Sequence, residues 1–189
     1  MHALAAATAL ALAGTSAQAA SLVDLHGQNV AQLNQQYKIA SATIGAPTKG
    51  SLRHAEMLGL DSDSTLSVIN SSTDKDGTQH FRYQQSFRGL PIFGEQVIVS
   101  QDKNGNIKNL FGRAVNGLAA EIPAGTPAVA KGRAFDIAKA AALGAHAVAA
   151  QIQREKNDLM IFIDDNGHAH KAYVVTFFSD NATKPTRPS

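Results

Sequence analysis

Side chains that alternate at period two dominate the run HFRYQQSFRGLPIFGE, residues 80–95, and constrain the fold more than any other part of the sequence. One side of this run would carry Phe81, Tyr83, Gln85 and Phe87. Such alternation is typical of a β-strand with one face against a core. Gly89 and Pro91 then indicate a tight corner, and the apolar pair of Ile92 and Phe93 precedes Gly94. The run predicts a strand, a corner and the start of a second strand, with Phe93 buried.

The first residues have the pattern of a secretory leader. Residues 1–19 contain no Asp, Glu, Lys or Arg, and residues 3–13 are almost entirely Ala and Leu. The triplet Ala17-Gln18-Ala19 has the small-x-small pattern of a cleavage site, although basic residues before the apolar run are missing. A membrane anchor is less suitable because it needs about 20 apolar residues. We expect a signal peptide over 1–19, with a buried Ala-rich helix as the alternative.

Composition limits both the stability and the chemistry of the remainder, about 170 residues, which is enough for one domain or two small ones. The chain has no cysteine, so packing alone must stabilise it, and Cys-based metal sites and thiol catalysis are excluded. Charged residues make up 17% and the formal net charge is +2, with the basic residues scattered. We therefore expect neither nucleic-acid binding nor stable membrane association.

The first half reads as two helices followed by a sheet. Helices are predicted over 24–37 and 52–58, the second ending at Gly59. Strands are predicted over 65–71, 80–87, 95–101 and 107–114, with tight turns at 74–77 and 102–106. Gly112 lies within the last of these strands, where glycine indicates a bulge or a close approach of another backbone.

The second half repeats this order without repeating the sequence. A linker is predicted over 118–126, and then a helix over 128–143 that begins near Pro127 and ends at Gly144. Its face towards a sheet would consist of Ala134, Ile137, Ala138 and Ala141. Strands over 147–154, 158–163 and 168–179 follow, with turns at 155–157 and 164–167. The fold class predicted is α+β, with two small units that each pack a helix on an antiparallel sheet.

Catalytic motifs are weak throughout. The zinc-protease signature HExxH, the nucleophile elbow G-x-S-x-G and the P-loop are all missing, and His54-Ala55-Glu56 is the nearest approach to the first of them. His168 and His170 would share a strand face and could chelate a metal, although a solvated face explains them more simply. A turn likewise explains Asp164 and Asp165 better than calcium binding does. We expect no active site in this chain.

The run RYQQ followed by G-x-P-x-FG, over residues 82–94, resembles a signature of the propeptides of secreted zinc metalloproteases of the thermolysin family. Residues 57–114 look like the fungalysin/thermolysin propeptide (FTP) motif, and the chain from Val129 looks like the PepSY-type module that follows it. Asp164-Asp165-Asn166, the stretch Tyr173 to Phe178 and Arg187-Pro188 are similar to the vibriolysin and pseudolysin branch. The resemblance implies two cystatin-like domains, an FTP domain over 20–117 and a PepSY-like domain over 127–189, separated by the linker 118–126.

That family role implies a propeptide that acts as an intramolecular folding chaperone and an inhibitor of its protease domain. The cognate metalloprotease catalytic domain would be the partner, zinc and calcium would belong to that domain alone, and bacterial export would make the protein secreted or periplasmic. Family propeptides continue beyond Arg-Pro with a further strand up to the cleavage point, so we expect this PepSY-like domain to be truncated at its C-terminus. The inhibitory segment and the protease domain would then be absent from this chain.

The resemblance also assigns roles to ten residues. Phe81, Tyr83 and Phe87 would form the sheet core; Gly89, Pro91, Phe93 and Gly94 would fix a corner that faces the protease; Arg82, Gln85 and Arg187 would make polar contacts. A stand-alone secreted inhibitor or binding module is the alternative, and the continuation of the reading frame distinguishes the two. A metal-binding enzyme that uses His168 and His170 is the third hypothesis.

Overall fold

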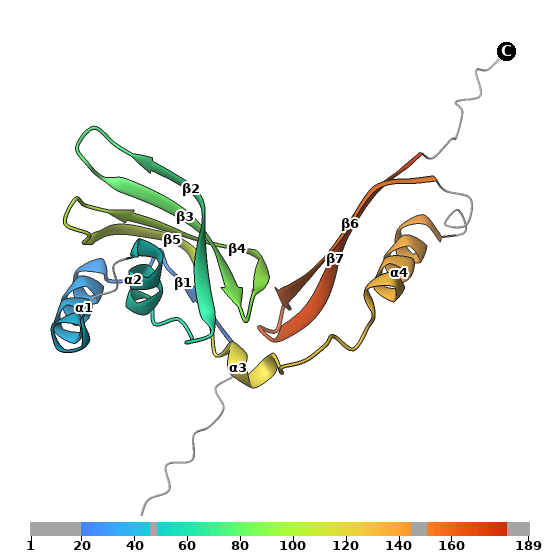
Figure 1. Cartoon of the computed structure of the whole chain (residues 1–189), viewed down its shortest axis with the longest axis horizontal. Coiled ribbons are helices and arrows are strands. Elements are labelled where there is room, and N and C mark those ends of the chain that lie inside the picture. The colour runs from blue at the N-terminus through green and yellow to red at the C-terminus, as the bar shows by residue number, and fades with distance from the viewer. Residues whose placement is uncertain (1–19, 46–48, 145–150, 181–189) are drawn as a thin grey trace, which may run out of the picture.

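The computed structural model of the chain describes residues 20–45, 49–144 and 151–180 (Figure 1). The predicted signal peptide and Arg187 lie outside these ranges. The strands are β1 (Ser21–Asp24), β2 (Ser64–Thr73), β3 (Gln79–Phe87), β4 (Leu90–Gln101), β5 (Ile107–Asn116), β6 (Gln151–Ile163) and β7 (Ala169–Asp180). The helices are α1 (Val30–Ile44), α2 (Gly50–Met57), α3 (Leu118–Glu121) and α4 (Lys131–Leu143). The fold is α+β, as predicted.

Five strands form an antiparallel sheet in the order β1-β5-β4-β3-β2, and α1 and α2 pack on one face of it. The core between these layers takes Tyr83, Val97, Val99 and Leu110 from the strands and Met57 from α2. The four predicted strands are confirmed, each between one and five residues longer than expected, and α2 matches the second predicted helix closely.

The first predicted helix, over 24–37, was wrong at both ends, because α1 extends from Val30 to Ile44. Ser21 to Asp24 instead form the edge strand β1, in register with Asn116 to Arg113 of β5. The helix begins only after Asn29, whose side chain accepts a hydrogen bond from the backbone N–H of Gln32 at 3.1 Å. Asparagine is a good N-cap, and the short apolar stretch before it is better satisfied by completing the sheet.

The corner predicted at Gly89 and Pro91 is a two-residue hairpin turn. Arg88 and Gly89 both have positive φ, 49° and 78°, which is the backbone of a primed turn. Ser86 and Pro91 are already partners in the ladder, so Pro91 lies within β4. The turn thus joins β3 directly to β4, and β4 begins five residues earlier than the sequence predicted.

At Gly112 the backbone of β5 comes close to that of β4, as predicted. Its φ is +86°, and a Cβ atom placed there would lie 2.0 Å from the backbone oxygen of Gln96. Only glycine allows β5 to come this near to β4.

The second half forms a long hairpin of β6 and β7, covered by α4. The turn at 164–167 is confirmed, but the turn predicted at 155–157 was wrong: β6 continues through it, with a bulge between Gln153 and Lys156 where Arg154 has a φ of 51°. α4 begins at Lys131 rather than at 128 and buries none of its residues fully. Phe135 of α4 contacts Phe177 of β7, and the two ring centroids lie 5.8 Å apart. In the described ranges this unit has one long helix and two strands, and a cystatin-like fold for either unit stays a prediction.

One residue pair joins the hairpin to the first sheet, where Ile92 of β4 lies parallel to Ile161 of β6. A second core surrounds this joint and consists of Phe87, Ile92, Val115, Leu118, Ile122, Ile161 and Ala169. Leu118 and Ile122, from the segment expected to be a linker, are thus fully buried. None of the helices in the described ranges is long and apolar enough to cross a membrane.

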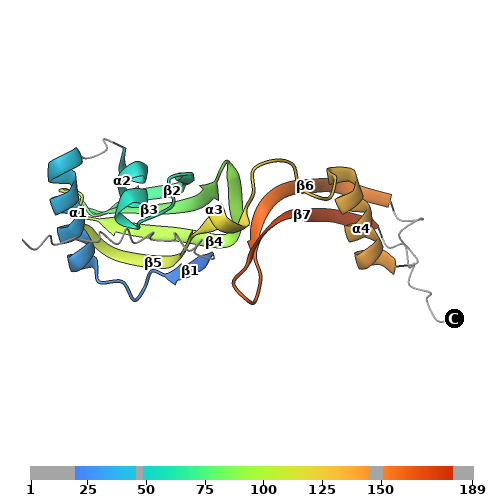
Figure 2. The ribbon, with the colours of Figure 1, turned by 90° about the horizontal axis from the view of Figure 1, so that it is seen from below.

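The helices gather on one side of the curved sheet and leave its other side bare (Figures 1 and 2). Both cores lie on the helix side. We call the bare side the helix-free face. It is defined by the side chains of β2, β3, β4, β5 and β6 that point away from the two cores.

Candidate functional site

The structure confirms the period-two alternation of the RYQQ run, whose side chains point in turn to the helix side and to the helix-free face of the sheet. Tyr83 and Phe87 are fully buried on the helix side. Phe81 stacks on Tyr83 with 5.7 Å between ring centroids and also contacts His54 of α2 at 5.6 Å. These aromatic side chains are therefore part of the core that holds α2 on the sheet.

Gln85 is also fully buried, which corrects its expected role as a contact with a partner. Its amide oxygen accepts a hydrogen bond from the backbone N–H of Val115 at 2.9 Å, and its amide nitrogen donates to the carbonyl of the same residue at 2.7 Å. Gln85 thus replaces a strand partner for the end of β5, where β4 has shifted out of register. The side chain closes the gap in the sheet between the two cores.

His54 is a buried polar residue whose importance the sequence did not reveal. Its exposed fraction is 0%, and its ring nitrogens lie 2.8 Å from the Tyr83 hydroxyl and 2.8 Å from Oε1 of Gln101. Gln101 uses its amide nitrogen to donate to Gln79, so its oxygen is the acceptor, and Nε2 of His54 must carry the proton. Nδ1 then accepts from the Tyr83 hydroxyl.

Burial is the main reason that the pKa of His54 falls from 6.5 to about 4, and the nearby Arg53 guanidinium lowers it further. Burial also raises the pKa of Tyr83 to about 12. Both groups are therefore neutral at physiological pH.

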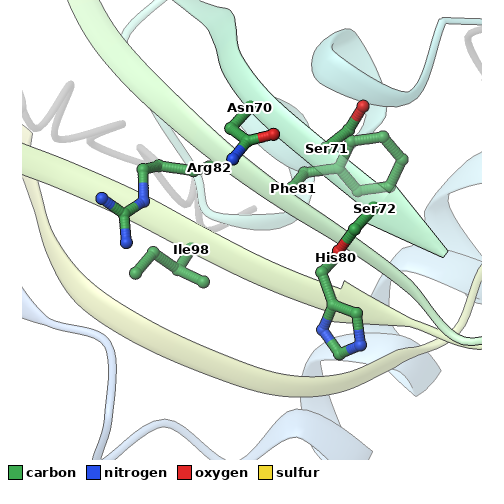
Figure 3. A pocket seen from close by; sticks show the side chains of 7 residues that line it. All are labelled: Asn70, Ser71, Ser72, His80, Phe81, Arg82 and Ile98. Carbon is green, nitrogen blue, oxygen red and sulfur yellow. The ribbon is translucent and has the colours of Figure 1, made fainter. Parts of the chain in front are cut away.

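A row of side chains crosses the helix-free face at the middle of the sheet. Asn70, Arg82, Ile98 and Phe111 are consecutive partners across β2, β3, β4 and β5. Directly opposed residues in antiparallel strands project to the same face. Figure 3 shows the Arg82 guanidinium beside Ile98, with Asn70 on the neighbouring strand. Among the described residues, no acceptor binds the Arg82 side chain.

Asn70, Arg82 and Ile98 of this row line a shallow hollow of about 160 Å³, which is too small for a typical small-molecule site. Its lining consists of Asn70, Ser71, Ser72, His80, Phe81, Arg82 and Ile98. A flat surface with an unpaired cation is better suited to a protein partner than to a small ligand.

An exposed aromatic pair lies further along the same face. Phe93 is 44% exposed, which corrects the expectation that it is buried with Ile92. Because Ile92 points into the second core, Phe93 points away from it, and so does Phe162, which follows Ile161. The two rings lie 6.4 Å apart, and Phe162 is 41% exposed. Exposed aromatic side chains grouped in this way are typical of protein interfaces.

Polar contacts attach α3 and the residue after it to the first unit. Arg88, in the turn after β3, donates to Asp63 at 2.7 Å and to the carbonyl of Ile122 at 2.9 Å. Asp61 accepts from the backbone N–H groups of Gly117 and Leu118, at 3.1 and 2.9 Å, and so caps α3. Gly94, with a φ of 78°, allows the bend that brings β4 to β6.

His168 and His170 do not converge on a metal site. Nδ1 of His168 lies 3.2 Å from Glu121, and Nε2 of His170 lies 3.1 Å from Asp164. Within the ranges that the structure describes, no group of three or more His, Asp or Glu residues is placed to hold a metal ion.

Sequence reasoning missed Phe162, Ile98 and Phe111 as members of the helix-free face. Ile98 lies between the buried Val97 and Val99, and this alternation along β4 was a usable signal. Phe162 lies in the uninterrupted apolar run Leu159 to Ile163, where no polar residue marks the exposed side. Its exposure follows only from the pairing of Ile161 with Ile92.

Comparison with known proteins bears on the strands just described. Residues 64–114, from the start of β2 to near the end of β5, match the family described as Fungalysin/Thermolysin Propeptide Motif. The chain is 34% identical over 113 residues to the neutral protease of Vibrio proteolyticus, covering 58% of this chain and 18% of that protein. It is 30% identical over 126 residues to the hemagglutinin/proteinase of Vibrio cholerae, covering 66% of this chain and 20% of the relative.

A longer match extends over both units. The zinc metalloproteinase of Legionella pneumophila is 26% identical over 195 residues, which covers 98% of this chain and 33% of that protein. The chain thus spans between about a fifth and a third of the length of these relatives. Strands β2 to β5 therefore carry the motif of fungalysin/thermolysin propeptides.

Proposed function

We propose that this chain is the propeptide of a secreted zinc metalloendopeptidase and acts as a folding chaperone and an inhibitor of its protease domain. The observation that carries the proposal is the match of the central sheet to a propeptide motif, in a chain whose relatives are named as proteases. Its partner would be the cognate catalytic domain, which would also hold the zinc and calcium. Export would place both in the periplasm or outside the cell.

The helix-free face is the surface that we assign to this partner. It combines the aromatic pair of Phe93 and Phe162 with the unpaired guanidinium of Arg82. Aromatic and Arg side chains provide most hot spots in protein interfaces. Gly89, Pro91 and Gly94 would act indirectly, by shaping the β3–β4 turn and the bend that present these side chains.

A chaperone role follows from binding. A surface that binds the native protease, or the transition state for its folding, lowers the barrier set by slow non-local contacts. The same affinity stabilises the folded protease by mass action. Inhibition further requires that part of the propeptide blocks the substrate cleft.

The reading frame after Ser189 provides the first test. A further strand followed by a helix with HExxH would identify a protease precursor. A stop codon would favour the stand-alone inhibitor or binding module, which would use the same face on a protease in trans.

Refolding provides the second test. The denatured protease encoded downstream, or otherwise the neutral protease of Vibrio proteolyticus, is refolded with and without this chain, and recovered proteolysis is measured. The Phe93→Ala/Phe162→Ala double variant should bind at least about tenfold more weakly and lose the rescue. Ile39→Ala is the matched control, because Ile39 is 66% exposed on α1, on the helix side. Equal rescue by the double variant would refute this face as the interface, and no rescue by the unmodified chain would refute the chaperone role.

A further inference from the structure

We propose that removal of residues 1–19 creates an N-terminal ammonium group on Ala20 that forms an ion pair with Glu121 and locks the joint between the two units. This inference rests only on the export part of the proposed function and is independent of any protease partner.

Ala20 is already positioned for this pair. It directly precedes β1, whose first residue, Ser21, is the partner of Asn116 at the end of β5. It also packs against the second core, beside α3 and the start of β7. From there its backbone N–H faces the carboxylate of Glu121, and this hydrogen bond contributes to the lowered pKa of that group.

Glu121 is a covered carboxylate without a permanent cation. Its side chain is only 17% exposed, and among the ion pairs of the described residues its partner is His168, at 3.2 Å. The other carboxylate oxygen accepts from the backbone N–H of Ala169 at 2.5 Å. By contrast, the similarly covered Glu95 has Arg113 at 2.7 Å. Hydrogen bonds from Ala169 and His168 already favour the charged form of Glu121, and a permanent cation beside it would stabilise that form further.

Cleavage after Ala17-Gln18-Ala19 would supply this charge. An export peptidase and one water molecule hydrolyse the Ala19–Ala20 peptide bond, which leaves a carboxylate on Ala19 of the leader and an amino group on Ala20. With an ordinary pKa of about 7.7–8.0, this amine is protonated at neutral pH. A neutral amide with one donor thus becomes a cation with three, and a carboxylate can accept about four hydrogen bonds. Glu121 therefore has the capacity to bind Ala20 while it keeps Ala169 and His168.

The carboxylate of Glu121 would then connect three elements of the fold. Glu121 belongs to α3, Ala20 leads into β1, and Ala169 opens β7. The ion pair would strengthen the hold on the edge strand β1 and on the hairpin in the same step. Processing would then stabilise the joint only after export.

The test compares four proteins in urea unfolding: the exported, processed chain and the unprocessed chain of residues 1–189, each with Glu121 and with Glu121→Gln. Glutamine keeps an acceptor for Ala169 but has no charge. Mass spectrometry of the exported chain should find Ala20 at the N-terminus. Glu121→Gln should reduce the folding equilibrium constant about tenfold more in the processed chain than in the unprocessed one. An equal effect in both forms, or an N-terminus other than Ala20, would overturn the proposal.

Dependence on pH provides a second readout. Pairing raises the pKa of the Ala20 ammonium, so its contribution is complete below about pH 8 and is lost as the pH rises further. The other charged groups at the joint are Glu121, His168, Asp61, Asp63, Arg88 and Lys171, and they are the same in the processed and unprocessed chains. The processed chain should therefore lose stability in this range and the unprocessed chain should not. Parallel profiles would count against the pair, whatever the refolding of a protease shows.

Discussion

Gln85 shows how a single polar side chain can hold a sheet together at a residue that looks like an interface position. Its side-chain amide forms hydrogen bonds with both the N–H and the carbonyl of Val115. Because the exposed fraction of Gln85 is 0%, water cannot take over these hydrogen bonds. Gln85→Leu keeps the size but leaves a buried N–H and a buried carbonyl without partners. Each such group costs about 1–3 kcal/mol, so we expect the free energy of unfolding to fall by about 2–5 kcal/mol.

Urea unfolding at pH 7 measures this loss. Gln96→Leu serves as the control, since Gln96 is exposed on the next strand and its side chain has no partner among the described residues. If both variants lose the same small amount, the hydrogen bonds of Gln85 do not support the sheet.

His54 should make the first unit sensitive to acid. Its pKa is about 4 in the folded state and about 6.5 when unfolded, so the unfolded chain binds more protons between these values. Stability is complete above pH 6.5 and falls as the pH drops towards 4, by about 3 kcal/mol in all. A protonated ring would also force Nδ1 to donate to the Tyr83 hydroxyl, which could no longer donate in return.

The measurement is the free energy of unfolding at pH 7.5 and at pH 4.5. His54→Gln should lower it at pH 7.5 but remove most of its decline in acid. His26→Gln should leave the decline intact, because His26 is exposed. A His54→Gln variant with the unmodified pH profile would show that other groups cause the acid sensitivity.

Among the elements, the β4–β5 pair depends on Gly112 for two separable reasons. One is its φ of +86°, and the other is the 2.0 Å distance from a Cβ atom to the Gln96 oxygen. Gly89 has a similar φ of +78° but open space around it. Gly89→Ala should thus cost about 1 kcal/mol from backbone strain alone, and Gly112→Ala more than about 3 kcal/mol because β5 must also move. Equal shifts in the two melting temperatures would show that the close approach does not matter.

Strands of the first unit could be predicted because each carries a local signal. Tyr83 and Phe87 alternate with polar neighbours, and turn residues at 74–77 and 102–106 separate the strands. The helix predicted from residue 24 and the turn predicted at 155–157 were wrong for one common physical reason. β1 is a strand because β5 offers it an edge, and β6 continues past Arg154 because β7 holds both sides of the bulge. Long-range pairing decides both cases, and it leaves little mark on the local sequence.

The helix-free face was predictable only in part for the same reason. The period-two pattern separates Arg82 from Tyr83 without any structure. It fails at Phe93, because Ile92 and Phe93 are both apolar and the sequence does not mark which of them faces the core. The exposure of Phe93 therefore had to come from its place beside β6.

At the scale of the whole molecule, the second core determines whether the chain behaves as one body or as two. Ile161 is fully buried in it and is the residue through which β6 pairs with β4. Ile161→Ala should cost about 2–5 kcal/mol of packing, concentrated at this joint. Because the first core does not include this residue, hydrogen exchange should become faster in β6 and β7 while Tyr83 of β3 and Val97 to Val99 of β4 stay protected. Leu110→Ala, in the first core, should instead accelerate exchange in β2 to β5. If Ile161→Ala unfolds both units together, the two cores form one cooperative structure, and the helix-free face is presented to a partner as a single rigid surface.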